Sequence, residues 1–271
     1  MINKAILVML TSLIFLSFQS KFSERFSVND LPIVKSERIP SFSKKESSNH
    51  RSSGDSAFNY FEQSSKQLYA KFGFHKWNKL RYDVFQKAYQ GYVVMKNEGM
   101  ISNSRYLTIM DFELSANKRR IWVLDLQKNK LALHDLVSHG KNSGEEYAHY
   151  FSNQHESYKS SLGFYVTGTN YIGKNDYSLR LHGVEVGFND NAYERGIVMH
   201  GADYVNNQYI RKHKRLGRSQ GCPAVSQKIN TWLINTIEGG SCIFIYYPDK
   251  TYLHRSEILN TEPQLKDLLT S

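Results

Sequence analysis

The sequence predicts an α+β fold that is rich in β-structure, either a sandwich or a partly closed barrel. After Met100, short apolar runs and a period of two dominate the pattern, as is typical of strands. Before Met100, apolar residues recur at steps of three and four, which indicates helices. Many short strands with few helices between them favour a sandwich or barrel.

Several stretches of the second half have the composition of strands. They are Tyr106–Phe112, Ile121–Leu126, Leu131–Ser138, Gly163–Thr167, Leu179–Leu181, Gly196–Met199 and Cys242–Tyr247. Turn signals at Asn117-Lys118 and at Lys128-Asn129 separate the first three stretches. We therefore expect a series of short strands joined by turns.

Helices are predicted on both sides of these strands. One covers Ala57–Phe72 and ends at Gly73, and a second begins at Tyr82 and ends before Gly99. A third is predicted over Ser226–Ile237, after the turn that contains Cys222. We expect the first two to pack together on the β-rich domain.

Composition divides the chain into parts. Residues 21–56 are rich in Ser, Lys and Arg and are predicted to be a flexible linker. Residues 57–105 form an N-terminal helical segment, and residues 106–250 form the domain that carries the chemistry. Residues 251–271 are predicted to be a polar, peripheral C-terminal tail.

Residues 1–20 have the pattern of an export signal. Lys4 supplies a positive charge, and the run Ala5–Phe18 carries none. A run of this length is in the range of a signal peptide and is short for a membrane span. Phe18 makes a poor cleavage site before Ser20, so an uncleaved N-terminal membrane anchor is the alternative. Both alternatives predict export, to the periplasm or cell envelope.

The charge of the chain bounds its partners. The 35 Lys and Arg outnumber the 25 Asp and Glu, for a net charge of +10, which favours anionic partners. No nucleic-acid-binding motif accompanies this charge, so nucleic acid is not an expected partner. The sequence has neither the histidine pairs of a metal site nor the Gly-x-Ser-x-Gly turn of a serine hydrolase, and we predict no metal and no cofactor.

The stretch 195–225 concentrates the reactive side chains. An apolar run ends at His200, a basic and loop-like segment follows, and the segment closes on Gly221 and Cys222. Gly221 lets the backbone turn tightly, so that Cys222 presents its sulfur. Because a thiol becomes a nucleophile when a nearby base takes its proton, Cys222 and His200 are predicted to be a nucleophile–base pair. The alternative is a cysteine that only fills the core.

The other cysteine, Cys242, lies in an apolar and aromatic run. We predict that it fills the core. In an exported protein the two cysteines also have the option of forming a disulfide.

These residues resemble the signature of the L,D-transpeptidases of bacterial cell walls. In that family His-Gly or His-Ser precedes Ser/Thr-His-Gly-Cys, and here His200-Gly201 precedes Ser219-Gln220-Gly221-Cys222. Ser160–Tyr165 is similar to the family's Thr-Pro-x-Gly-x-Phe strand entry. The resemblance covers roughly Tyr106–Tyr247 and is close to a murein L,D-transpeptidase branch with Arg-Ser-x-Gly-Cys-Pro-Ala.

The sequence departs from the commoner family pattern beside the cysteine. Gln220 stands where most members have His, and Ser161 stands where many have Pro. Pro223-Ala224 replaces an apolar residue followed by Arg or Asn. The last departure bears on substrate choice, because that Arg or Asn is thought to hold the substrate loop in the family.

The resemblance implies a twisted β-sandwich, with a helix beside the cysteine loop, that carries out cysteine acyl transfer on peptidoglycan stem peptides. It implies that the Gly201 carbonyl orients His200, and Asp203 stays open as the alternative. Backbone N–H groups near Gly221 and Cys222 are expected to stabilise the oxyanion. Ser219 and Arg218 are expected to lie beside the substrate.

The acceptor of the acyl group is left open by the resemblance. An amine of a second stem peptide, or of a wall-attached protein, gives a cross-link or an anchored protein. Water as the acceptor gives an L,D-carboxypeptidase, and a catalytically dead wall-binding protein is the non-enzymatic alternative. The basic run either attracts the carboxylates of stem peptides and favours the thiolate, or forms a solvated loop. Its members are Arg211, Lys212, Lys214, Arg215 and Arg218.

Overall fold

The computed structural model describes residues 51–75 and 79–262. Contacts divide the chain into two units, Met1–Asn49 and His50–Ser271, and all described residues belong to the second. The predicted export signal over residues 1–20 therefore lies outside the described residues, as does the predicted linker up to residue 50. Among the described helices, none has both the length and the apolar character needed to cross a membrane.

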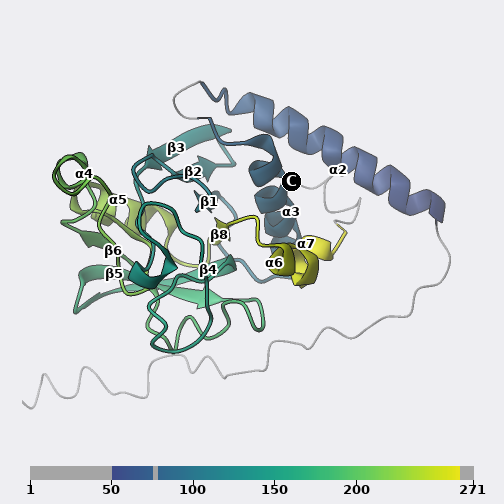
Figure 1. The fold of residues 1–271 in the computed structure, drawn as a ribbon. Helices are drawn as coiled ribbons and strands as arrows, with labels where there is room; N and C mark the ends of the chain where they lie inside the picture. The colour runs from purple at the N-terminus through teal and green to yellow at the C-terminus, as the bar shows by residue number, and fades with distance from the viewer. Residues whose placement is uncertain (1–50, 76–78, 263–271) are drawn as a thin grey trace, which may run out of the picture. The chain divides into compact units, whose positions relative to one another are not determined.

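The described residues form an eight-stranded mixed sheet in the order β3-β2-β1-β8-β4-β5-β6-β7 (Figure 1). The strands are β1 (Tyr106–Asp111), β2 (Ile121–Asp125), β3 (Lys130–Asp135), β4 (Gly163–Gly173), β5 (Asp176–Gly183), β6 (Val198–Ala202), β7 (Ala224–Ser226) and β8 (Cys242–Tyr246). Strand β1 pairs with β8 in parallel, as β6 does with β7, and the other neighbours are antiparallel. Just beyond β3, Ser138 bridges Ala224 of β7. The two edges of the sheet therefore meet in a nearly closed barrel, which confirms the predicted β-rich α+β fold.

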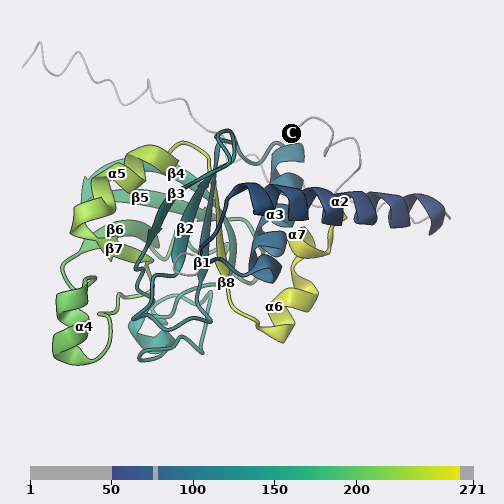
Figure 2. The same cartoon turned by 90° about the horizontal axis from the view of Figure 1, so that it is seen from above.

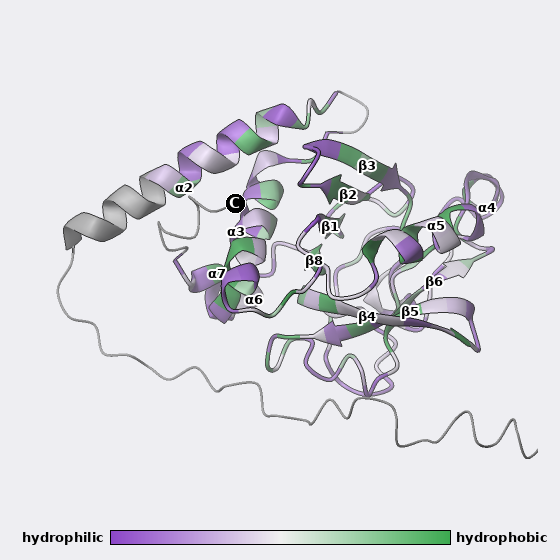
Figure 3. Cartoon of the chain, turned by 180° about the vertical axis from the view of Figure 1, so that it is seen from behind, coloured by the Kyte–Doolittle hydropathy of each residue, from purple (hydrophilic) through white to green (hydrophobic). Residues whose placement is uncertain are grey.

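Helices cover the sheet on two sides (Figure 2). They are α2 (Arg51–Lys71), α3 (Tyr82–Asn97), α4 (Asn207–His213), α5 (Gln227–Ile237), α6 (Lys250–Arg255) and α7 (Glu257–Asn260), with a short 3₁₀ turn η1 (Lys141–Ser143). Helix α3 packs on β1 and β8, α2 packs on α3, and α5 packs on β5, β6 and β7. Helices α3 and α5 carry hydrophobic beside hydrophilic residues (Figure 3), and their hydrophobic residues include the buried Phe85, Met95, Leu233 and Ile237.

Three elements differ from the sequence-based prediction at their ends or in kind. Helix α2 begins at Arg51, so the predicted flexible linker is wrong for residues 51–56. Strand β7 was not predicted, because a stretch of three residues after a proline is too short to show a period. Helix α4 replaces part of the predicted loop: it buries none of its residues and so lacks an apolar period. Its start is fixed by Asn206, whose side chain accepts a hydrogen bond from the Tyr209 amide at 2.7 Å.

Strands β4 and β5 form a hairpin that is longer than predicted. The outer part of β4 contains Gly168 and Asn170, which are residue types depleted in strands. The pairing with β5 shifts register between Thr167 and Asn170 and then continues to Gly173. An irregular but paired strand of this kind has no clean alternation for the sequence to show.

The C-terminal residues as far as 262 are not the peripheral tail that was predicted. Tyr252 of α6 and Ile258 of α7 are buried. The Tyr252 hydroxyl donates to Oε2 of the buried Glu185 at 2.9 Å, and the Ser256 hydroxyl donates to Oε1. Burial raises the pKa of Glu185, and these donors act in the opposite direction. Tyr252 and Ile258 are the two buried side chains of an otherwise polar segment. Two such residues are too few to show a period in the sequence.

We expect Tyr252→Phe to lower the free energy of unfolding by about 1–3 kcal/mol, because it removes a hydrogen-bond donor from a buried carboxyl group. Urea unfolding followed by circular dichroism measures the change. Tyr247→Phe, the same change at a half-buried tyrosine outside this cluster, is the control. An equal loss in both variants would contradict the anchoring role of Glu185.

Candidate active site

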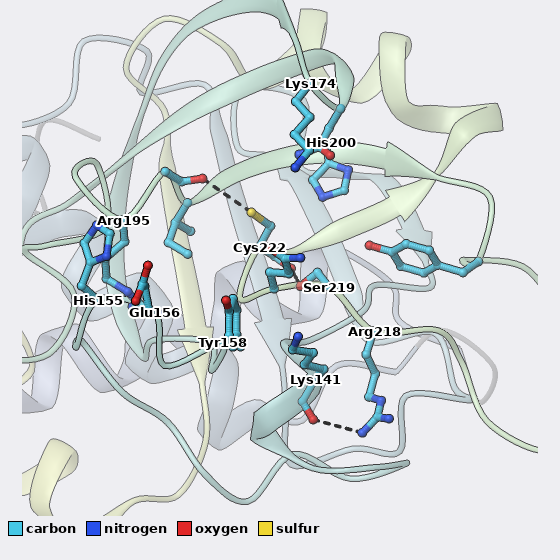
Figure 4. A pocket seen from close by; sticks show the side chains of 15 residues that line it. Lys141, His155, Glu156, Tyr158, Lys174, Arg195, His200, Arg218, Ser219 and Cys222 are labelled. Atoms are coloured by element: carbon cyan, nitrogen blue, oxygen red, sulfur yellow. Dashed lines mark hydrogen bonds between the residues drawn. The ribbon is translucent and has the colours of Figure 1, made fainter.

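Strands β6 and β7 bring Cys222 and His200 to one pocket. The parallel pairing sets His200 beside Ala224, and Cys222 precedes β7 closely enough to reach the start of β6. There the Val198 amide donates to Sγ of Cys222 at 3.5 Å, and Sγ–H donates to the Gly196 carbonyl at 3.7 Å. Both side chains line a pocket of about 530 Å³ (Figure 4). Residues that are far apart in sequence thus meet because two short strands pair.

Two glycines lie in close contact with their surroundings at this site, and one of them is required by its backbone conformation. A Cβ at Gly201 would lie 2.3 Å from the side-chain oxygen of Gln227, so a larger residue there needs the Gln227 side chain to move. Gly221 has a φ of +126°, and a Cβ there would meet Ile197 and the Lys159 carbonyl at 3.0 Å. The turn that presents Cys222 is therefore available only to glycine at position 221.

His200 is held as a neutral base. Its Nδ1 lies 2.9 Å from the Gly201 carbonyl, an acceptor, so Nδ1 carries the proton and Nε2 keeps its lone pair. Burial lowers the pKa of His200, and the hydrogen bond to Gly201 opposes that shift. Of the two orienting partners that the sequence allowed, the contact is made by Gly201; Asp203 is exposed.

Cys222 is held as a thiol. Burial raises its pKa, while the Val198 amide and the charge of Arg195 act to lower it. Across the described residues, no hydrogen bond joins Sγ to the His200 ring, and the sulfur is turned toward Gly196 instead (Figure 4). The pair is therefore a neutral thiol and a neutral imidazole on the same pocket.

The hydroxyl of Ser219 holds the cysteine loop together. It donates to the Cys222 carbonyl at 2.6 Å and accepts from the Gly221 amide at 3.1 Å. The Gly221 N–H is thus occupied, and of the two amides expected at the oxyanion, only that of Cys222 is left. Ser219 was predicted beside the substrate; it does line the pocket, but these bonds use its hydroxyl within the loop.

Ser160 ties the same loop to the neighbouring segment. Its buried hydroxyl accepts from the Gly140 amide at 3.0 Å and donates to the Gly221 carbonyl at 3.1 Å. In the sequence, Ser160 is notable only as the first residue of the Ser160–Tyr165 strand entry. The segment around Gly140, which contacts the cysteine loop, shows no strand pattern in the sequence. Its contact with the loop is an isolated bridge between Gly140 and Ser219.

We expect Ser160→Ala to lower the free energy of unfolding by about 1–3 kcal/mol, because the Gly140 amide and the Gly221 carbonyl then stay buried without a partner. Denaturant unfolding measures this loss. Thr236→Ala, which removes a solvent-accessible hydroxyl on α5, is the control and is expected to have a smaller effect. A stability equal to that of the control would show that Ser160 does not support the loop.

Comparison with known proteins identifies the family of this domain. The family described as "L,D-transpeptidase catalytic domain" matches residues 76–246. The chain belongs to this family. No curated protein matches the chain.

Solved structures include similar L,D-transpeptidases. One from Mycobacterium smegmatis is 12% identical, with a TM-score of 0.34, and the match covers 53% of this chain and 59% of that one. One from Stackebrandtia nassauensis is 14% identical, with a TM-score of 0.33, covering 67% and 75%. L,D-transpeptidase 3 from Mycobacterium tuberculosis is 12% identical, with a TM-score of 0.33, covering 53% and 61%. The match thus spans less than two thirds of the first of these proteins, and the family assignment rests on the family match.

The positive charge in the pocket of this L,D-transpeptidase domain comes mostly from residues outside the predicted basic run. Arg218 lines the pocket, but its guanidinium donates to the Lys141 and Gly144 carbonyls and pairs with Glu145 at 2.7 Å. Arg211, Lys212 and Lys214 are exposed and are not among the pocket-lining residues. The other pocket cations are Lys141, Lys174 and Arg195. They come from three separate segments, so they do not form a basic run that the sequence could show.

Arg120 and His139 support the cysteine loop through hydrogen bonds. Arg120 is fully buried and donates from Nη2 to Nδ1 of His139 at 2.7 Å. Burial lowers the pKa of His139 to about 3, so His139 is a neutral acceptor. The His139 carbonyl in turn accepts from the Ser219 amide at 3.0 Å. Neither residue was among the candidates predicted from the sequence.

Cys242 lies in β8 and is fully buried. Both cysteines are free, and Sγ of Cys242 lies 3.8 Å from Sδ of Met95. The prediction that Cys242 fills the core is confirmed.

Proposed function

We propose that this domain is a cysteine L,D-transpeptidase that acts on the stem peptides of peptidoglycan. The observation that carries the proposal is the meeting of Cys222 and His200 on one pocket, in a chain of the L,D-transpeptidase family. A neutral imidazole with a free Nε2 is the form that takes a proton from a thiol.

Acylation is the first half of the proposed reaction. Sγ–H of Cys222 turns from the Gly196 carbonyl to Nε2 of His200 and gives up its proton. The thiolate attacks the carbonyl of the third stem residue, and the bond from that carbonyl to the next residue, D-Ala, breaks. The imidazolium returns its proton to the leaving amine, and the acyl group stays on sulfur as a thioester.

Deacylation runs through the same two side chains. An acceptor amine attacks the thioester while His200 takes one of its protons. The new amide forms, the thiolate leaves, and the imidazolium protonates it, which restores the starting state. If water replaces the amine, the same steps give the carboxypeptidase product.

The negative oxygen of each tetrahedral intermediate needs donors close to Sγ. We assign the Cys222 amide to this role, since the Gly221 amide is occupied by Ser219. Stem peptides carry carboxylates, and Lys141 and Lys174 on the pocket wall complement that charge. These two exposed lysines provide a positive wall in a chain that lacks the usual Arg or Asn at position 224.

We further propose that the domain works outside the inner membrane, because cross-linked wall lies there and residues 1–20 have the pattern of an export signal. A reporter that is active only after export, fused after residue 60, is expected to be active. Reporter activity confined to the cytoplasm would contradict this location.

The test of the function is incubation of the purified chain with a disaccharide tetrapeptide, followed by mass spectrometry. A cross-linked dimer with loss of D-Ala supports transpeptidation. A tripeptide alone would show a carboxypeptidase. Binding of the tetrapeptide without any product would show a wall-binding protein, and either of these last results overturns the proposal.

A further inference from the structure

Arg195 is a pocket cation that the proposed reaction leaves without a role. It lies one residue before Gly196, whose carbonyl accepts from the Cys222 thiol. Its guanidinium packs on the open side of Gly221, where a Cβ would lie 3.6 Å from Nη2. Arg195 therefore lies beside both backbone segments that position the Cys222 sulfur, at Gly196 and at Gly221.

The guanidinium of Arg195 is fixed entirely by neutral groups. Nη1 donates to the Ser152 carbonyl at 2.7 Å and to the Ser161 hydroxyl, and Nη2 donates to the Ser157 hydroxyl at 3.1 Å and the Lys159 carbonyl at 2.8 Å. In the part of the chain that the structure describes, no carboxylate forms an ion pair with it. Its positive charge is therefore not cancelled, since carbonyls and hydroxyls bring only dipoles.

These hydrogen bonds prevent the Arg195 guanidinium from binding a substrate carboxylate directly. Both terminal nitrogens are committed, and Nε is buried without a hydrogen-bond partner. A bidentate clamp needs two free N–H groups on one edge of the guanidinium. What Arg195 offers to the pocket is a fixed charge.

Other charges near Cys222 are weaker candidates for this role. Lys141, His155, Glu156 and Lys174 line the pocket but are exposed, so water screens them. Arg218 is paired with Glu145. Burial lowers the pKa of His200, which is neutral, and burial raises the pKa of Tyr204.

We propose that Arg195 is a positioning residue that stabilises the Cys222 thiolate electrostatically, in addition to the imidazolium that forms when His200 takes the thiol proton. The proposal rests on the proposed function in taking Cys222 as the nucleophile. The charge of Arg195 is present before and after His200 takes the proton, because the Ser152 and Lys159 carbonyls hold the guanidinium in place. The lowering of the pKa of Cys222 by Arg195 has the sign that this role requires.

The experiment is the pH dependence of Cys222 alkylation by iodoacetamide in the full-length chain, with the site mapped by peptide mass analysis. In Arg195→Gln we expect the pH midpoint of Cys222 alkylation to rise by about one pKa unit. At any pH below the midpoint, this shift makes the thiolate fraction roughly tenfold smaller. Arg195→Lys keeps the charge and is expected to shift less. Lys159→Gln, which removes a charge on the same segment, is expected to leave the midpoint unchanged. An unchanged midpoint in Arg195→Gln would overturn the proposal and leave Arg195 a structural role only.

A second pair of variants covers the case in which Arg195 variants do not fold. Ser157→Asp sets a carboxylate against Nη2 and cancels the charge while keeping Arg195 in place, and Ser157→Asn is its neutral match. We expect a higher midpoint in Ser157→Asp alone, and equal midpoints would overturn the proposal. Alkylation needs no wall substrate, so these results stand apart from the muropeptide assay that tests the function.

Discussion

Cys222→Ala is expected to abolish acyl transfer, with a rate loss of about 10⁴-fold or more, while the fold stays intact. The sulfur is the atom that bonds to the acyl group, and no other described thiol faces the pocket. Loss of the side chain leaves a small space beside Gly196 and Val198 without exposing a buried charge. Turnover of disaccharide tetrapeptide and the circular dichroism spectrum measure the two parts of this prediction.

Cys242→Ala is the matched control, because it removes the other thiol from a fully buried position in β8. Activity should persist in this variant, with some loss of stability from the cavity. Unchanged turnover in Cys222→Ala would refute the assignment of the nucleophile.

His200→Ala is expected to slow acylation by about 10²–10⁴-fold, since a general base contributes about that much. A carbapenem is a suitable reagent, because its strained β-lactam carbonyl acylates a nucleophile without the need for a wall substrate. Mass spectrometry follows the covalent adduct on Cys222. His213→Ala, which removes an exposed imidazole on α4, is the control.

The pH dependence of this acylation has a defined sign. His200 acts in its neutral form, so the rate falls as the pH drops through the pKa of His200. Burial lowers that pKa, so the loss should occur below the value of about 6.5 for a free imidazole. Equal adduct formation in His200→Ala, or an adduct on Cys242, would show that Cys222 is not activated by His200.

The β-rich fold was predictable where strands are apolar and regular. Strands β1, β2 and β8 are buried almost throughout, and runs of apolar residues show this in the sequence. Strand β7 and helix α4 were not predictable, because the former has three residues and the latter has no buried face. Their formation depends on partners elsewhere in the chain, which a local pattern does not contain.

The two reactive residues of the candidate site were predictable from the sequence, but the residues that hold them in place were not. The spacing of His200 and Cys222 in polar, glycine-containing sequence identified the pair. Arg195, Ser160 and Arg120 act through contacts with segments far away in the chain. Each has an ordinary local context, a charge or hydroxyl in a turn, so only the three-dimensional arrangement distinguishes them.

The bridge between Ser138 and Ala224 has a consequence for the order of folding. It joins the end of the first three strands to the strand that follows Cys222, so the cysteine turn is completed only when distant parts of the chain come together. Contacts of such long sequence separation are expected to form late, because closing the long loop costs entropy before the contacts contribute any stability. The β6–β7 pairing that brings His200 near Cys222 is of shorter range, and the long-range support of the cysteine loop is expected to follow it. A chain still unfolded carries an ordinary cysteine, and reactivity appears together with the native barrel.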